Sequence, residues 1–200
     1  MQQTSPRRSN RERTETTRTA LLDAARTLIV RNGYAGTSTP EIASEARVTR
    51  GALYHHFADK RDLFRAVLER EAEAVAAQIR DATPAAMPAM EALLAGSLAY
   101  LDAMAIPGRT RLLLVDGPAV LGLDEIAAID AAHSARTLQE GLEAVMAASG
   151  DRSIPIPALA VLLSAAFDRA ALAIEAGSEP NDFRSAVLRL VERVVASVPG

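Results

Sequence analysis

Two short segments between Pro40 and Lys60 restrict the fold of this chain more than any other feature of its sequence. PEIASEA (Pro40–Ala46) and VTRGALYHHFADK (Val48–Lys60) each suit a short helix, and one residue separates them. Two short helices joined by a tight turn make a helix-turn-helix. The second segment also gathers side chains that suit contact with a polyanion: Arg50, Tyr54, His55, His56 and Lys60.

Capping residues and apolar spacing predict helices on both sides of this motif. We expect a first helix over about Thr14–Arg31, stopped by Asn32-Gly33. Ser38 with Glu41 predicts a capping box for the second helix, and Thr49 is expected to cap the third. The inward-facing positions predicted here are Leu21, Leu22, Ala25, Leu28, Ile29, Ile42, Ala43, Leu53, Phe57, Leu63, Phe64, Val67, Leu68, Val75 and Ile79.

The remaining sequence also favours helix, because it is rich in alanine and lacks strand-like alternation. The fold class is therefore predicted to be all-α, with a three-helix head, a helical body and about nine helices in total. The body helices are expected at about Met87–Met104, Arg109–Val115, Asp124–Ala148, Ala158–Ala176 and Asn181–Ser197.

Charge is unevenly distributed along the chain. Residues 1–65 hold 12 Lys or Arg and 7 Asp or Glu, whereas residues 66–200 hold 10 and 18. A basic head on an acidic body is the pattern expected when the head alone meets a polyanion. The chain has no cysteine, no signal-like apolar segment and no unbroken apolar run of spanning length, so we expect a cytoplasmic protein with no membrane partner.

The third helix suits the major groove of DNA, where side chains at a helix N-terminus read base edges. Arg50 is the first candidate for base contact, because its guanidinium matches two acceptors of guanine. Gly51 and Ala52 permit close approach. Phosphate contacts are expected from Tyr54, His56 and Lys60, with His55 suited to either role and with Ser38, Thr39 and Thr49 near the helix starts.

Each of these residues also has an ordinary explanation. Tyr54 could pack its ring against the head, Lys60 could be a solvated helix-start residue, and the two histidines could be an exposed pair. A metal site at His55-His56 is disfavoured, because adjacent helical residues diverge and no third ligand lies nearby in the sequence. We therefore expect no metal and no cofactor.

Residues 14 to about 70 resemble the DNA-binding domain of the tetracycline-repressor (TetR) family of bacterial regulators. The resemblance rests on Gly33-Tyr34, Thr37-Ser38, Ile42-Ala43, Ala46, Val48-Thr49, Gly51, Leu53-Tyr54, His56-Phe57, Lys60 and Leu63-Phe64. It implies that Tyr54 and Lys60 meet DNA backbone and that Arg50, Gly51 and His55 face bases or sugar-phosphate. The sequence departs from the family at Arg47, where glycine is frequent, and at Pro40, where some members make a base contact.

The body is expected to hold a ligand and a partner copy. An apolar stripe that suits a small-molecule pocket, or equally a packed core, comprises Met87, Met90, Leu94, Leu98, Leu101 and Met104, with Phe167 added. Possible polar anchors are Tyr100, Asp116, His133 and Asp168. A four-helix dimer interface is predicted from Leu159, Leu162, Leu163, Ala166, Phe183, Val187, Leu190, Val191 and Val194, although a monomeric bundle would show the same stripes.

These observations predict a basic arm without regular structure over residues 1–13, a DNA-binding domain over 14–60 and a ligand-binding and dimerisation domain over 61–200. The function expected is a homodimeric repressor on a palindromic double-stranded operator, released by an apolar small molecule. The alternatives are a helical partner-binding or structural protein with no effector, and an enzyme or metal protein using His55, His56 and His133. No catalytic spacing supports an enzyme.

Overall fold

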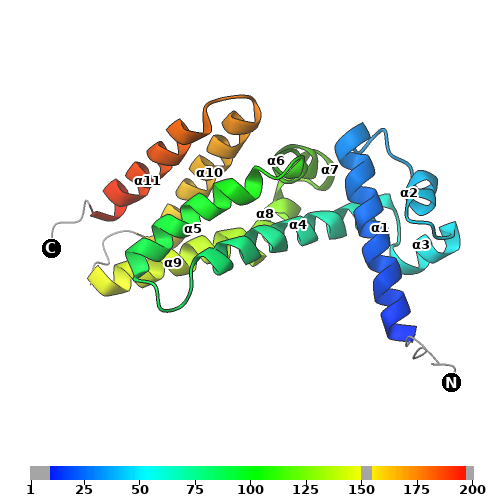
Figure 1. Cartoon of the computed structure of the whole chain (residues 1–200), viewed down its shortest axis with the longest axis horizontal. Coiled ribbons are helices and arrows are strands. Elements are labelled where there is room, and N and C mark those ends of the chain that lie inside the picture. Colours follow the sequence, from blue (N-terminus) through cyan, green and yellow to red (C-terminus); the bar gives the residue numbers. More distant parts are fainter. Residues whose placement is uncertain (1–9, 150–154, 197–200) are drawn as a thin grey trace, which may run out of the picture. The chain divides into compact units, whose positions relative to one another are not determined.

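The computed structural model describes residues 10–149 and 155–196, and its regular structure there is helical throughout, with no strand (Figure 1). Contacts divide the chain into two compact units that meet between Val67 and Leu68, inside helix α4. The all-α prediction is confirmed. Most of the predicted arm lies outside the described residues, but its last four residues are helical, because α1 begins at Asn10.

The first unit contains α1 (Asn10–Asn32), α2 (Thr39–Glu45), α3 (Arg50–His56) and the start of α4 (Lys60–Ala82). Gly33 ends α1 with a φ of 74°, a left-handed conformation that glycine adopts without strain. All fifteen predicted inward-facing residues are buried, those of the first unit around Leu21, Ile42, Leu53 and Phe64. The helix-turn-helix is therefore mounted on a packed core.

The second unit contains the rest of α4 and a bundle in which α5 packs against α9, α10 and α11. Its remaining elements are α5 (Ala89–Met104), α6 (Arg109–Arg111), the π-helical turn η1 (Leu112–Asp116), α7 (Gly117–Leu121), α8 (Leu123–Ala132), α9 (Ser134–Ser149), α10 (Ile156–Glu175) and α11 (Pro180–Ala196). In Figure 1, α10 and α11 form a hairpin at one side of this bundle.

Two predicted helix boundaries in the body are wrong. The helix expected to stop at Asp116-Gly117-Pro118 continues through η1 and α7, because Pro118 stands in the first turn of α7, where no N–H is needed. Gly117 serves close packing there: a Cβ would lie 2.8 Å from the Ile126 side chain. The single helix expected over Asp124–Ala148 is broken at His133, whose backbone leaves the helical region (φ −126°, ψ −100°).

One ion pair is enclosed in the second unit. The Nε atom of Arg109, at the start of α6, lies 2.9 Å from Glu71 Oε2 on α4, and both side chains are less than a tenth exposed. The same guanidinium donates to the Ala103 carbonyl at 2.9 Å and to Gln78 Oε1 at 3.1 Å. Arg109 therefore fastens α4 to the segment where α5 ends and α6 begins.

Helix α10 is long and apolar enough to cross a membrane by length and composition, with a mean hydropathy of 1.6 over its most apolar window. The bent pair formed by α5 and residues 109–121 passes the same test if it is counted as one span. Core helices of globular proteins have this composition too. Since α10 packs against α5, α9 and α11, its apolar character has an explanation within the bundle.

Candidate functional site

The outer surface of α3 presents most of the residues predicted to contact DNA. Arg50, Gly51 and His55 are exposed, and Tyr54 is 48% exposed. The Tyr54 hydroxyl lies 3.1 Å from Thr39 Oγ1, which joins α3 to the start of α2. This hydrogen bond, followed by the neighbouring Arg50 guanidinium, lowers the pKa of Tyr54. A base-reading candidate and a phosphate-contacting candidate therefore lie side by side.

Gly51 has no packing role within the protein. A Cβ at this position would meet only Thr49 Oγ1, at 3.9 Å. The missing side chain therefore leaves space on the outer surface of α3 rather than in the core. A surface glycine next to Arg50 is what the close approach of another macromolecule requires.

The residues near the helix starts are occupied with capping. Thr49 Oγ1 accepts from the Ala52 N–H at 3.1 Å, as predicted. Ser38 and Glu41 form the predicted capping box, in which the Ser38 N–H and hydroxyl both donate to Glu41 Oε2 at 2.8 and 2.7 Å. These bonds lower the pKa of Glu41. A phosphate at Ser38 would have to displace a carboxylate, so the structure favours Thr39 over Ser38 at this end.

Lys60 is engaged inside the head. Its Nζ atom donates to the carbonyls of Tyr34 and Thr37 at 2.8 and 2.9 Å and lies 4.0 Å from the centre of the Tyr34 ring. The ammonium therefore holds the connector between α1 and α2 in place. Two of its three N–H groups are used in these bonds, so at most one remains for the predicted phosphate contact.

The turn before α3 contains the one non-glycine residue with positive φ among those the structure describes. Arg47 has φ 56°, and its N–H donates to the Ser44 carbonyl at 3.0 Å. The left-handed region is unfavourable for a residue with a Cβ. This explains why glycine suits the position, and it leaves an exposed guanidinium on the turn of the motif.

The two histidines differ in environment. His55 is exposed, whereas His56 is half-buried, and their rings lie 5.5 Å apart. Partial burial, then His55 and Arg18, lower the pKa of His56. This environment disfavours the charged imidazolium in the free protein. Across the described residues, no group of three or more His, Cys, Asp or Glu side chains could hold a metal ion.

Among the described residues of the second unit, two cavities and a groove are of ligand size. The first cavity, of about 310 Å³, lies among Ile79, Leu93, Gly96, Gly141 and Phe167. The second cavity, of about 410 Å³, is lined by residues of α4, α5, η1, α7, α8, α9 and α10. The groove, of about 720 Å³, runs along α8, α9 and α10. Tyr100 and Ser134 line both cavities, so the two adjoin.

Part of the predicted ligand stripe lines these spaces. Met87 and Phe167 line the first cavity and Met104 the second, whereas Met90, Leu94, Leu98 and Leu101 line neither the cavities nor the groove. Helix α5 is apolar on several faces, and the face beside the cavities carries its small residues, Gly96 and Ser97. Periodicity could not distinguish this face from the others.

Polar groups of the second cavity come from four helices. The Tyr100 hydroxyl on α5 donates to Asp168 Oδ1 on α10, and Ser134 Oγ on α9 donates to Asp130 Oδ1 on α8 at 2.6 Å. Burial raises the pKa of Asp168 to about 6, with Tyr100 lowering it and Asp130 raising it. Tyr100 and Asp168 were predicted as anchors; Asp130 and Ser134 were not.

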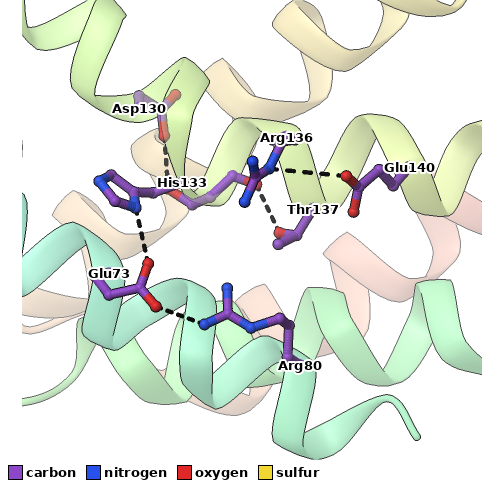
Figure 2. A network of polar contacts seen from close by, with 8 residues as sticks. Glu73, Arg80, Asp130, His133, Arg136, Thr137 and Glu140 are labelled. Carbon is purple, nitrogen blue, oxygen red and sulfur yellow. Dashed lines mark hydrogen bonds and ion pairs between the residues drawn. The ribbon is translucent and has the colours of Figure 1, made fainter. Parts of the chain in front are cut away.

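The other two predicted anchors bind elsewhere. Asp116 Oδ2 lies 3.4 Å from Arg111 Nε. His133, at the break between α8 and α9, places Nδ1 3.0 Å from Glu73 Oε2 on α4, and Glu73 also pairs with Arg80 at 2.6 Å. Figure 2 shows this chain of contacts, with Asp130 and Arg136 on the neighbouring turns. Helix α4 is thus tied to the α8–α9 break.

The predicted dimer residues divide into two groups. Leu159, Leu163, Val187 and Val191 are buried in the core of the protomer itself, and Ala166, Phe183 and Val194 are half-buried. Leu162 and Leu190 face outward, with 69% and 40% exposure. Val161, also 69% exposed, was missed. Helices α10 and α11 therefore present an apolar outer surface, centred on fewer residues than predicted.

Comparisons with known proteins match both units. Residues 21–67 match the sequence model of bacterial regulatory proteins of the tetR family, and residues 90–198 match that of the tetracyclin repressor-like C-terminal domain, which alone spans more than half of the chain. The chain belongs to the TetR family. Within this TetR-family chain, the first match contains α2 and α3 and the second contains α5 to α11.

Individual relatives agree with this assignment. The HTH-type transcriptional regulator AcrR of Shigella flexneri is 45% identical over 62 residues, 31% of this chain and 29% of that protein. The HTH-type transcriptional activator FasR of Mycolicibacterium smegmatis is 34% identical over 96 residues, 48% of this chain and 44% of that protein. The TetR-family chain therefore matches less than half the length of these curated relatives.

A solved structure covers nearly the whole TetR-family chain. A TetR-family transcriptional regulator from Pectobacterium atrosepticum is 30% identical, with a TM-score of 0.68, and the match covers 94% of this chain and 95% of that one. The likeness therefore includes the helical body that holds the cavities.

The charge on Asp168 should destabilise the folded protein. Its folded pKa of about 6 lies above the ordinary aspartate value of 3.8, so the folded state binds more protons between these values and stability falls as the pH rises through that window. Asp168→Asn should therefore be more stable than the wild type at pH 8, by about 1–3 kcal/mol. Urea unfolding from pH 4 to pH 8 measures the difference, which should shrink towards pH 4. A variant less stable than the wild type at pH 8 would contradict this account.

Proposed function

We propose that this protein is a DNA-binding transcriptional regulator, a cytoplasmic homodimeric repressor that a small, largely apolar molecule releases from a palindromic operator. The observation that carries the proposal is the outer surface of α3, where Arg50, Gly51 and Tyr54 are exposed together on a capped, packed helix-turn-helix. A helix with an exposed arginine at its N-terminus, next to a glycine with open space outside it, is suited to enter the major groove.

A dimer accounts for the apolar surface of α10 and α11. Two copies related by a two-fold axis would cover Leu162 and Leu190 and would place two recognition helices on one DNA. A two-fold protein reads a two-fold site, and this is the reason to propose a palindromic operator.

The cavities favour an effector over a purely structural body. A volume of 310–410 Å³ with mostly apolar walls is typical of small-molecule sites. Helix α4 supplies Val75 to the second cavity and Ile79 to the first, and its first residues belong to the DNA-binding unit. A ligand that contacts α4 differently in two states shifts the balance between those states.

Relatives of this chain include both activators and repressors. FasR of Mycolicibacterium smegmatis is named an activator, whereas BepR of Brucella suis, 44% identical over 64 residues, is named a repressor. An activator and a repressor are thus both similar to part of this sequence. We propose repression because a repressor acts by occupying its operator and needs no contact with a further protein. Its release by a ligand is then enough to change transcription.

Arg50→Ala should relax the sequence preference of the protein. Loss of a bidentate base contact removes about 1–3 kcal/mol, which is about 5- to 150-fold in affinity for DNA selected from a random pool. Fluorescence anisotropy on the selected DNA and on single-base-pair variants measures this loss. Arg111→Ala removes an equal charge from an exposed site in the second unit and should bind normally. An Arg50 variant weakened equally on every sequence would instead make Arg50 a phosphate contact.

Gly51→Ala should separate folding from DNA binding. Since the new methyl group meets no closer atom than Thr49 Oγ1 at 3.9 Å, stability should stay unchanged or rise by up to about 1 kcal/mol. DNA affinity should fall about tenfold if the groove surface approaches this position. Gly117→Ala is the comparison, because its Cβ would clash at 2.8 Å and lower stability. Normal DNA binding by Gly51→Ala would place α3 away from the groove floor.

Leu162→Glu should convert the dimer to monomers. A charge placed at the centre of an apolar interface opposes association, and sedimentation equilibrium measures the change in mass. Leu123→Glu introduces the same charge at a leucine that is 75% exposed on α8 and should leave the assembly intact. Equal masses for the wild type and the Leu162 variant would remove this surface from the dimer.

A further inference from the structure

The second cavity combines apolar walls with acidic groups. Val75, Met104, Leu114 and Ile126 belong to its walls, and its polar lining residues are Tyr100, Asp130, Ser134 and Asp168. Among the residues that the structure describes, no lysine, arginine or histidine lines this cavity. Two carboxylates therefore face an apolar space without a matching positive charge.

The two aspartates stand where the second cavity meets the groove. Asp130 and Asp168 line both, and the groove adds Glu140 and Glu143. The one basic residue that lines the groove in the described part of the chain, Arg136, places Nε 3.8 Å from Glu140 Oε1. The surface beside the two aspartates is thus acidic, which favours the approach of cations.

Each aspartate is partnered by a neutral donor. Tyr100 donates to Asp168, and Ser134 donates to Asp130. Within the described part of the chain, neither carboxylate has a lysine, arginine or histidine at ion-pair distance. Burial of a carboxylate costs free energy unless an opposite charge offsets it. For Asp168 this cost is visible in a pKa raised by burial to about 6.

We propose that the second cavity binds a positively charged organic molecule, with its cationic group at Asp130 and Asp168 and its apolar body against Val75, Met104 and Leu114. The inference rests on the proposed function only in naming this molecule as the effector. A neutral ligand would leave the two charges uncompensated, and an anion would be repelled by them. A hydrated metal ion lacks the apolar part that the walls would cover.

Three probes with one apolar body test the charge preference: 4-phenylbutyltrimethylammonium, 4-phenylbutanol and 4-phenylbutanoate. Thermal shift and isothermal titration at pH 8 should show the cation binding about tenfold tighter than the alcohol, and the anion weakest, because a ligand that binds the folded state raises its stability. Equal or tighter binding of the alcohol or the anion, or binding by none of the three, overturns the proposal. Mg²⁺ as chloride should give no shift.

Asp168→Asn and Asp130→Asn identify the site. Each should lower the affinity for the cation about tenfold, or about 1.4 kcal/mol, while the alcohol binds as before. Asp182→Asn removes a carboxylate from α11, which lines neither cavity nor groove, and should bind the cation normally. Retained alcohol binding shows that a variant is folded. Wild-type cation affinity in both cavity variants contradicts the site.

The pH profile gives a second readout. Cation affinity should fall between pH 7 and pH 5 as Asp168 becomes protonated, and Asp168→Asn should flatten that fall. The titratable and charged groups that face Asp168 from the neighbouring helices are Tyr100 on α5, Asp130 on α8, and Arg136, Glu140 and Glu143 on α9. A profile that is unchanged in the variant would show that the fall in affinity does not arise from Asp168 and would overturn its role.

The outcome is separable from that of the proposed function. Charge-selective binding that depends on Asp168 in a protein without operator binding would sustain the cavity assignment and reject the regulator. Operator binding together with release by the alcohol or the anion would sustain the regulator and reject the cationic ligand.

Discussion

The ion pair between Arg109 and Glu71 fixes the position of α4 against the end of α5 and the start of α6. One guanidinium reaches a carboxylate on α4 and a backbone carbonyl near the end of α5, both buried, and it also reaches the amide of Gln78 on α4 at the edge of the core. An apolar pair of the same volume often stabilises a core equally well or better. The ion pair instead makes the packing specific. The N–H donors of the Arg109 guanidinium have a fixed geometry, so they can all be satisfied in only one register of α4 against the α5–α6 turn. Val75, Met104 and Leu113 then lie around one cavity.

Helix α4 connects this arrangement with the rest of the chain. Glu73, two residues after Glu71, bonds His133 at the break between α8 and α9. Asp130 and Ser134 lie on either side of that break and line the second cavity. A molecule that moves Asp130 therefore acts on a segment already bonded to α4. The segment between α8 and α9 thus lines the second cavity and is bonded to α4 through His133.

The head could be read from the sequence because its signals are local. The Ser38–Glu41 box, the Thr49 cap and the Gly33 stop each involve residues within four positions of each other, and all three are present. The body could be read only in outline. Its break at His133 coincides with a contact to Glu73, 60 positions earlier, and no proline or glycine marks it. Helices α5 and α10 are apolar on several faces, so the sequence did not reveal which face lines a cavity.

The candidate sites divide in the same way. Exposure of Arg50 and Tyr54 follows from the helical spacing of α3, whereas the pairing of Asp168 with Tyr100 joins residues 68 positions apart and could be anticipated only as two separate polar groups. Lys60 shows the limit most clearly. Its positive charge and its position after α3 predict a phosphate contact. In the folded protein its ammonium also binds two backbone carbonyls, and no pattern of side chains in the sequence indicates such partners.

Lys60 is also the only lysine in the sequence. Its ammonium is held by two carbonyls and the Tyr34 ring, so opening of the α1–α2 connector should raise its reactivity towards an amine-reactive reagent. The rate of acylation at this one side chain therefore reports the opening equilibrium of the connector in the native protein. Lys60 is thus a natural probe of local unfolding in the head, and no reactive residue has to be introduced by mutation.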